Sequence, residues 1–234
     1  MTEQTITLIT GANRGLGYET ARRLIEAGHT VYIGARDAGN GRIAADALGA
    51  RFVRVDVTDD VSVDAAAAEI LRLEGRVDVL INNAGIAGPG LGAAETTVDA
   101  MRAVFETNVF GTVRVTHAFL PLLRASERPV VVDVSSGLGS FGVVNDPARF
   151  EFGIINVAYN SSKAAVSMLT VQYAKAFPGM RINAVDPGYT ATDFNGHSGS
   201  QTVEEGTDAI VRLATMGGDG PTGAFLNRDG QLAW

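Results

Sequence analysis

The chain has 234 residues, no cysteine and a formal net charge of -7 at pH 7. The lack of cysteine excludes disulfides, thiolate zinc sites and cysteine nucleophiles, and the acidic balance argues against a nucleic-acid partner, because phosphate backbones require clustered lysine and arginine. The length and a hydrophobic content of 46% predict one folded domain over residues 1–234. No apolar run reaches the roughly 18 residues of a membrane span, and Glu3 stands where a signal peptide would be basic, so we expect a cytoplasmic protein without membrane association.

The segment from Thr5 to Gly28 has the pattern of a strand, a glycine-rich turn and a helix. Its apolar run ends at Gly11, and apolar residues at helical spacing begin after Gly17. The backbone N–H groups of such a turn and the start of the helix converge on one point, which favours a diphosphate. We therefore predict a dinucleotide site, although the spacing G-x-x-x-G-x-G, with Gly15 in the middle, differs from the common G-x-G-x-x-G. The alternative is a turn that only connects strand and helix.

Apolar runs and helical patterns alternate along the rest of the chain. Strands are expected at residues 30–36, 51–57, 77–82, 130–135, 181–185 and 223–226, and helices at 40–48, 61–73, 98–123, 158–177 and 203–215. This order predicts the α/β class, as a single-domain Rossmann-type doubly wound parallel sheet of about seven strands with helices on both faces. Such a sheet binds its ligand beyond the carboxyl ends of the strands.

The end of the second predicted strand bears on cofactor choice. Ala35 stands where an NAD-specific site usually has an acidic residue, and Arg36 follows it. A 2′-phosphate would have room beside Ala35 and could pair with Arg36 and with Arg14 of the glycine turn, which predicts NADP rather than NAD. Either arginine alone could be a solvated surface charge, and Asp37 would be the ribose ligand if the strand ended slightly later.

Two more strand ends lie where a bound nucleotide would pass. The third strand ends in Asp56 and Val57, and the fourth ends in the sequence NNAG at residues 82–85. Asp56 could instead cap the helix that opens near Val61, and the asparagines could form only a turn.

Tyr159 and Lys163 are four residues apart at the start of a predicted helix and therefore share one face of it. A free tyrosine has a pKa of about 10, and a neighbouring cation lowers that pKa, so the pair can transfer a proton near neutral pH. The pattern Tyr-x-x-x-Lys alone is common in helices. It gains weight from Ser135 and Ser136, which end the fifth predicted strand and face the same crevice.

Six motifs occur in the order and approximate spacing of one enzyme family: TGANRGLG, NNAG, TNVFG, VSS, YNSSK and DPG. Over nearly its whole length the chain resembles the short-chain dehydrogenase/reductase family. The resemblance implies that Tyr159 is the general acid and that Ser136 hydrogen-bonds the substrate carbonyl. It also implies that Lys163 lowers the tyrosine pKa and binds the nicotinamide ribose, and that Asn108 of TNVFG holds a water in a proton relay. Alternatively, Asn108 is only a polar break in a long helix.

The resemblance also implies which residues surround the cofactor and the substrate. Leu138 and Tyr189 are expected to line the substrate pocket. The histidines, His29, His117 and His197, have no spacing suited to a metal, so no metal site is expected. The NADP contacts are expected from the glycine turn, the strand ends and the catalytic and DPG segments: Gly11, Asn13, Arg14, Gly15, Leu16, Gly17, Arg36, Asp56, Val57, Asn83, Ala84, Gly85, Tyr159, Lys163, Pro187, Gly188, Thr190 and Thr192.

Both ends of the chain, TGANRGLG with GARD and the final GPTGAFLNRDGQLAW, resemble the carbonyl-reductase branch of the family. That branch uses NADPH to reduce ketones, aldehydes and quinones, so the implied partner is a small-molecule carbonyl substrate. The alternative is an NADP-linked alcohol dehydrogenase or ketoacyl reductase of the same fold. A non-catalytic NADP-binding sensor is disfavoured, because it would have no use for Ser136, Tyr159 and Lys163 together.

Two segments depart from the family pattern. Ser136 and Tyr159 are 23 positions apart, more than in most of the family, which predicts an insertion at about residues 141–157. The carbonyl-reductase branch has a longer insertion in this place. Only a short segment separates Phe194 from the helix near Val203, where many relatives have a helical substrate lid.

The insertion also bears on the oligomeric state. In many relatives the two long helices, here residues 98–123 and 158–177, pair with the same helices of a second subunit. An apolar insertion lying over the second helix would fill the groove that a partner needs, so a monomer is favoured and a dimer is the alternative. The apolar residues expected to cover the helix are Phe141, Phe150, Phe152, Ile154 and Ile155.

Overall fold

The computed structural model describes residues 4–216 and 220–234. Its strands form one sheet in the order β3-β2-β1-β4-β5-β6-β7-β8, parallel throughout except where β8 pairs with β7. The predicted doubly wound α/β class is confirmed, and β8 is one strand more than the expected seven. The strands are β1 (Ile6–Thr10), β2 (Thr30–Ala35), β3 (Arg51–Arg54), β4 (Val79–Asn82), β5 (Val130–Val134), β6 (Arg181–Val185), β7 (Phe225–Asn227) and β8 (Gly230–Gln231).

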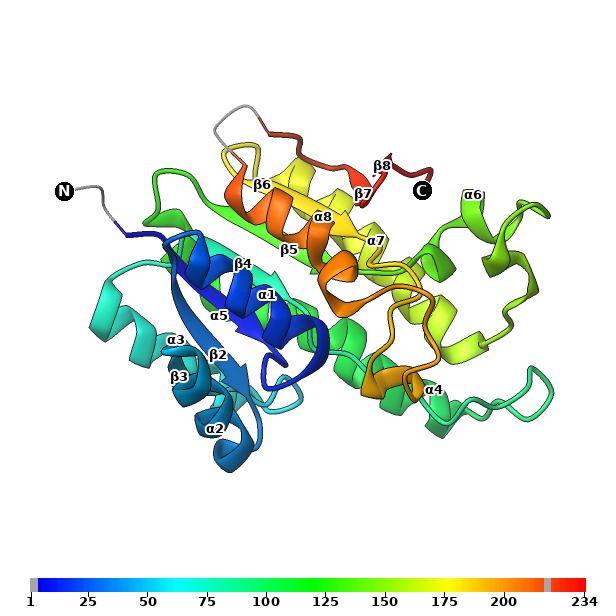
Figure 1. Ribbon diagram of the computed structural model, residues 1–234, viewed down its shortest axis with the longest axis horizontal. Helices are drawn as coiled ribbons and strands as arrows, with labels where there is room; N and C mark the ends of the chain where they lie inside the picture. Colours follow the sequence, from blue (N-terminus) through cyan, green and yellow to red (C-terminus); the bar gives the residue numbers. More distant parts are fainter. Residues whose placement is uncertain (1–3, 217–219) are drawn as a thin grey trace.

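Helices cover both faces of the sheet (Figure 1). One face carries α1 (Gly15–Glu26), α2 (Ala38–Leu48) and α8 (Val203–Thr215), and the other carries α3 (Asp60–Glu74), α5 (Gly111–Arg124) and α7 (Val157–Ala176). Successive strand residues point to opposite faces, so Leu8 and Ile9 of β1 are fully buried in different cores. Burial on both sides explains why these strands have continuous apolar sequences.

Several predicted strands are too long at their carboxyl ends. β2 ends at Ala35, so Arg36 lies in the loop that follows, and β3 ends at Arg54, three residues earlier than predicted. These residues leave the sheet at the edge where a ligand would bind. The predictions for 181–185 and 203–215 are confirmed, whereas β4 begins two residues later than predicted and β7 is displaced to Phe225–Asn227.

Two aspartates act as helix caps. The Asp37 carboxylate accepts a hydrogen bond from the backbone N–H of Asn40 at 2.8 Å and caps α2. Asp59, rather than Asp56, caps α3 by accepting from the N–H of Val61 at 3.0 Å. The alternative role of Asp56 as a helix cap is therefore wrong.

The predicted continuous helix at 98–123 is interrupted in its middle. α4 (Val98–Phe105) leads into a π-helical turn, η1 (Glu106–Phe110), before α5 begins at Gly111. The wider turn contains Asn108, which is 1% exposed. Single π-turns inside α-helices are frequent at functional sites, so this irregularity marks Asn108 for closer inspection.

The insertion at 141–157 forms the short helix α6 (Phe141–Val144) and the 3-10 turn η3 (Phe150–Gly153), at the right of Figure 1. Four of its large apolar side chains are between 54% and 73% exposed: Phe141, Phe150, Phe152 and Ile155. The prediction that these side chains cover the second long helix is therefore wrong. The prediction of a monomer loses this support, and the oligomeric state stays a prediction.

Candidate active site

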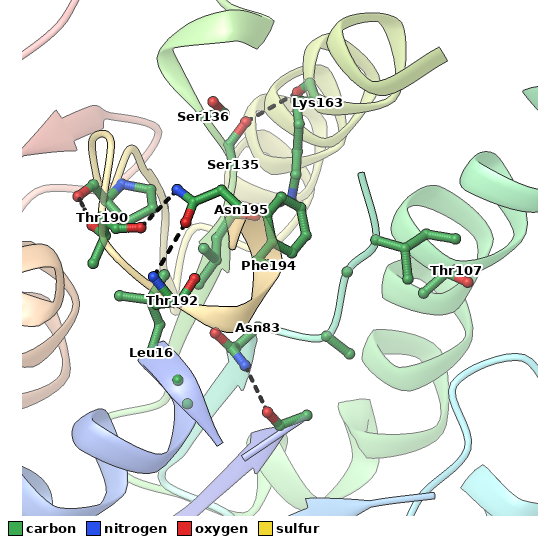
Figure 2. Close-up of a pocket in the computed structure, with 18 of the residues that line it drawn as sticks. Leu16, Asn83, Thr107, Ser135, Ser136, Lys163, Thr190, Thr192, Phe194 and Asn195 are labelled. Carbon is green, nitrogen blue, oxygen red and sulfur yellow. Dashed lines mark hydrogen bonds between the residues drawn. The ribbon is translucent and has the colours of Figure 1, made fainter. Parts of the chain in front are cut away.

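A cavity of about 390 Å³ lies beyond the carboxyl ends of the first six strands. The segments that line it follow β1 to β6, as expected for a doubly wound sheet. All the predicted cofactor and substrate residues line it, together with Ser136, and of the predicted residues only Asn108 lies behind its wall. Figure 2 shows the cavity with Leu16, Asn83, Lys163 and Thr192 around it.

The glycine turn is built for close approach of the backbone. Gly11 has a φ of 65°, and a Cβ there would lie 3.0 Å from the Cα of Ala84. A Cβ on Gly17 would lie 2.6 Å from Nδ2 of Asn83 and 2.8 Å from the Gly11 carbonyl oxygen. The Asn83 amide in turn donates to the carbonyl of Thr10 at 2.8 Å and to the carbonyl of Gly11 at 3.2 Å, the second of which is drawn in Figure 2. Asn83 therefore holds the turn in place, and the turn exposes backbone rather than side chains to the cavity.

Two arginines stand at the end of the cavity near β2. Arg14 and Arg36 both line it and both are exposed to solvent. The Arg14 guanidinium lies 3.4 Å from the Asp193 carboxylate, which reaches it from the segment after β6. Both arginines therefore line the same cavity as Ala35.

Asp56 lines the same cavity, after the edge strand β3. Burial disfavours its charged form, but hydrogen bonds from Thr58 and the positive charges of Arg36 and Arg54 outweigh burial and hold the pKa of Asp56 below its usual value. The Thr58 hydroxyl donates to its carboxylate at 2.7 Å. Arg54, at the end of β3, was not predicted as a site residue, because its place beside Arg36 depends on the pairing of β2 with β3.

Tyr159, Lys163 and Ser136 meet at the other end of the cavity. The Asn156 side chain caps α7 by accepting from the N–H of Tyr159 at 3.0 Å, so the helix begins just before the tyrosine. Lys163 is 5% exposed, and its Nζ donates to the carbonyl of Val134 at 2.7 Å and lies 5.7 Å from the Tyr159 ring centre.

The two serines after β5 have different partners. Ser135 donates to the backbone carbonyl of Lys163 at 3.0 Å, as drawn in Figure 2, and hydrogen-bonds Ser167 at 2.9 Å. Ser136 accepts from the N–H of Leu138 at 3.2 Å and lines the cavity with Tyr159, whose pKa it affects. Ser135 therefore fastens α7 to the sheet, whereas Ser136 stands beside the tyrosine, as predicted.

The pKa of Tyr159 is shifted in the opposite direction to the prediction. Burial raises it above its ordinary value, the hydrogen bond from Ser136 lowers it by less, and the charge of Asp186 raises it further. Burial also lowers the pKa of Lys163 to about 8. The Tyr159 pKa is therefore raised overall in the free protein, because the helix face that brings the two groups together also removes both from water, and the lowering effect of the lysine stays a prediction.

Asn108 makes three hydrogen bonds with its side-chain amide. Its Oδ1 accepts from the N–H of Ile86 at 2.8 Å, and its Nδ2 donates to the Ile86 carbonyl at 3.0 Å and to the Ser162 hydroxyl at 2.9 Å. The amide thus joins the π-turn, the segment after β4 and α7. A Cβ on Gly85 would lie 3.3 Å from the Asn108 Oδ1 and 3.6 Å from the Lys163 Nζ, so both groups come close together at this glycine.

Aromatic side chains line the mouth next to the tyrosine. Phe150 of the insertion stacks on Tyr189 with ring centres 5.3 Å apart, and Phe194 packs against Tyr159 at 5.8 Å. Tyr189 was predicted for the substrate pocket, but Phe150 and Phe194 were not. The aromatic residues of the insertion could have indicated a substrate pocket, but the sequence analysis placed them over the second long helix.

Comparison with known proteins agrees with this arrangement. The family model for short chain dehydrogenases matches residues 5–202. The chain belongs to this family. It is therefore an oxidoreductase of a family that binds a nicotinamide cofactor, as the motifs predicted.

Individual relatives match this chain over most of its length. A short-chain dehydrogenase of Penicillium roqueforti is 38% identical over 91% of this chain and 89% of its own, and the (-)-isopiperitenone reductase of Mentha piperita is 31% identical over 98% of both. The NADPH-bound carbonyl reductase from chicken fatty liver has a TM-score of 0.86 and 28% identity, covering 99% of this chain and 100% of its own.

In the described ranges, 4–216 and 220–234, no helix has the length and apolar character to span a membrane. The same residues contain no group of three or more histidine, aspartate or glutamate side chains that could hold a metal ion.

Proposed function

We propose that the protein is an NADPH-dependent reductase that converts a ketone, aldehyde or quinone carbonyl to the alcohol. The observation that carries this proposal is the meeting of Ser136, Tyr159 and Lys163 in the same cavity as the glycine turn. The cavity has backbone groups for a diphosphate at one end and a proton donor at the other, which are the two requirements of the reaction.

The residues of the cavity fit an NADP cofactor. Gly11 and Gly17 leave no side chain where a diphosphate would lie against the start of α1. Arg14 and Arg36 would pair with the 2′-phosphate beside Ala35, and Lys163 would bind the ribose next to the nicotinamide. The other residues predicted to contact NADP, among them Asn13 and Thr192, also line the cavity.

When bound, NADPH supplies a hydride to the carbonyl carbon. Tyr159 donates its phenolic proton to the carbonyl oxygen, and Ser136 donates a hydrogen bond to the same oxygen. The phenol of Tyr159 is protonated at neutral pH, as a proton donor must be. Lys163 faces the tyrosine ring and stabilises the phenolate until it regains a proton, and Asn108 fixes the backbone behind them, where it can also hold the predicted water.

The substrate is a small molecule that contacts the aromatic mouth. Leu138, Tyr189, Phe150 and Phe194 form its walls. A dehydrogenase or ketoacyl reductase of the same fold would use the same residues, but the net charge of -7 disfavours docking of an acidic carrier protein.

An NADPH-oxidation assay with a panel of ketones, aldehydes and quinones tests the function. We expect turnover of at least one member, followed as loss of NADPH absorbance, and little turnover with NADH. Tight NADPH binding without turnover of any carbonyl compound would support a non-catalytic sensor instead.

Replacing Arg36 with alanine tests the choice of cofactor. A charge-assisted hydrogen bond contributes about 1.5 to 3 kcal/mol, so Arg36→Ala should weaken NADPH binding at least about tenfold and leave NADH binding nearly unchanged. The matched control is Arg102→Ala, because Arg102 is an exposed arginine that pairs with Asp99 and does not line the cavity. Equal losses for NADPH and NADH would contradict the assignment.

Replacing Ser136 with alanine tests the oxyanion contact. The hydroxyl acts on charge that develops during the reaction, so Ser136→Ala should lower kcat about 10²- to 10³-fold with a smaller effect on NADPH affinity. Titration of NADPH binding beside steady-state kinetics separates the two effects. A loss confined to NADPH affinity would show that Ser136 serves the cofactor and not the substrate.

A further inference from the structure

The ammonium of Lys163 is in an environment that penalises its charge. The residue is 5% exposed, and among the described residues its Nζ hydrogen-bonds the neutral carbonyl of Val134 at 2.7 Å. A buried cation is costly unless an opposite charge compensates it. A negative charge nearby would therefore stabilise the ammonium.

A buried carboxylate lies on the same side of the sheet. Asp133 precedes Val134 in β5 and is 1% exposed. Its Oδ1 accepts from the side-chain amide of Asn82 at 2.8 Å, and its Oδ2 accepts from the Thr170 hydroxyl at 2.8 Å. Both donors are neutral, so no hydrogen-bond partner cancels the charge of Asp133.

The strand and the helix place Asp133 next to Lys163. Asp133 and Ser135 alternate along β5 and both point toward α7, where they bind Thr170 and Ser167. Lys163 comes one turn before Ser167 and two turns before Thr170, so the three residues share the helix face that packs on β5. Asp133 and Lys163 therefore lie at the same buried interface between β5 and α7, with the carboxylate on Thr170 and the ammonium on the Val134 carbonyl.

We propose that Asp133 is a positioning residue of the active site, the buried counter-charge that keeps Lys163 protonated beside Tyr159. The inference rests on the proposed function only where it concerns turnover. Burial lowers the pKa of Lys163 to about 8 and the charge of Asp133 opposes that lowering, while the lysine in turn opposes the raised pKa of Asp133.

Other ionisable groups around this pair have different partners. Asp186, after β6, accepts from the N–H of Gly188 at 3.0 Å and acts on Tyr159. Tyr173 of α7 is half-buried, and burial raises its pKa, with a smaller contribution from the charge of Asp133. Among the residues that the structure describes, Asp133 is the one acid whose charge affects the Lys163 pKa.

Direct titration of the lysine tests the inference without an activity assay. The chain has two lysines, Lys163 and Lys175, so NMR of protein carrying ¹³C at the lysine ε-carbon gives two signals, which Lys175→Arg assigns. We expect Lys163 to titrate near pH 8 in the wild type and at least one pH unit lower in Asp133→Asn. An unchanged or higher midpoint in the variant would overturn the proposal.

Asp133→Asn is compatible with the fold. The Oδ1 of Asn82 is buried without a hydrogen-bond partner in the described residues, so it can accept from the new amide. If Asp133→Asn does not fold, the same NMR titration is carried out on Asp133→Ser. Thr170→Val is the matched control, because it removes a hydrogen bond to Asp133 and keeps the charge. An equal shift in Thr170→Val would assign the effect to the hydrogen-bond network and overturn the counter-charge.

The pH dependence of kcat/KM gives the functional readout. A protonated lysine is lost as pH rises through its pKa, so the ratio of Asp133→Asn to wild-type activity should fall about fivefold between pH 6 and pH 8 if the midpoint drops by one unit, and further if it drops by more. A constant ratio at all pH values would indicate a purely structural role and overturn the proposal. Failure of the wild type to reduce any carbonyl would overturn the proposed function, and the NMR titration would still decide the role of Asp133.

Discussion

Tyr159→Phe is expected to lower turnover of the best carbonyl substrate about 10²- to 10⁴-fold, because it removes the proton that the alkoxide must receive. NADPH affinity should change little, since the ring keeps its packing against Phe194 at 5.8 Å and the helix cap at Asn156 uses only the backbone of residue 159. Single-turnover kinetics with saturating NADPH measure the loss at the chemical step.

The matched control for this substitution lies on the same helix. Tyr173→Phe removes a phenolic hydroxyl from α7 at a residue that packs against Phe177 and does not line the cavity. Its turnover should stay within about twofold of the wild type, as expected for a change remote from the chemistry. If Tyr159→Phe retained activity similar to that of Tyr173→Phe, another group would have to supply the proton.

The cofactor end of the site could be predicted from the sequence because it is built from local segments. The turn from Gly11 to Gly17 follows one strand directly, and parallel strands bring their carboxyl ends to one edge of the sheet. Arg36, Asp56 and Asn83 follow other strands, so the order of strands and helices already places them at that edge.

The substrate end could not be predicted in the same way. Phe150 reaches the mouth because the insertion folds back onto Tyr189, a contact between distant parts of the chain that no local pattern specifies. The π-turn at Asn108 could not be predicted either, because a continuous helical pattern does not show where one extra residue widens the helix.

The sign of the tyrosine pKa shift also depends on tertiary structure. Four-residue spacing correctly predicts that Tyr159 and Lys163 share a helix face. It does not reveal that this face packs over β5 and Ser135, where loss of water raises the phenol pKa and lowers that of the ammonium. Burial is a property of the assembled layers and outweighs the charge of the sequence neighbour.

Gly17→Ala is expected to weaken NADPH binding about 10- to 100-fold, equivalent to about 1.4 to 2.7 kcal/mol, and to lower the free energy of unfolding by about 1 to 3 kcal/mol. The added methyl group would lie 2.8 Å from both the Ala12 Cα and the Gly11 carbonyl oxygen, so the backbone of the turn must shift. The donors that face the diphosphate would move with it.

Calorimetric NADPH titration at a temperature where the variant is folded separates binding from stability, which thermal unfolding measures. Gly179→Ala is the matched control, because a Cβ at that position meets no atom within 4 Å and the change should leave both quantities near their wild-type values. If Gly17→Ala bound NADPH as tightly as Gly179→Ala, the diphosphate would not rest on this turn. A loss of stability with unchanged affinity would assign Gly17 to the packing of α1 on β1 alone, and the cofactor would have to be sought elsewhere along the strand ends.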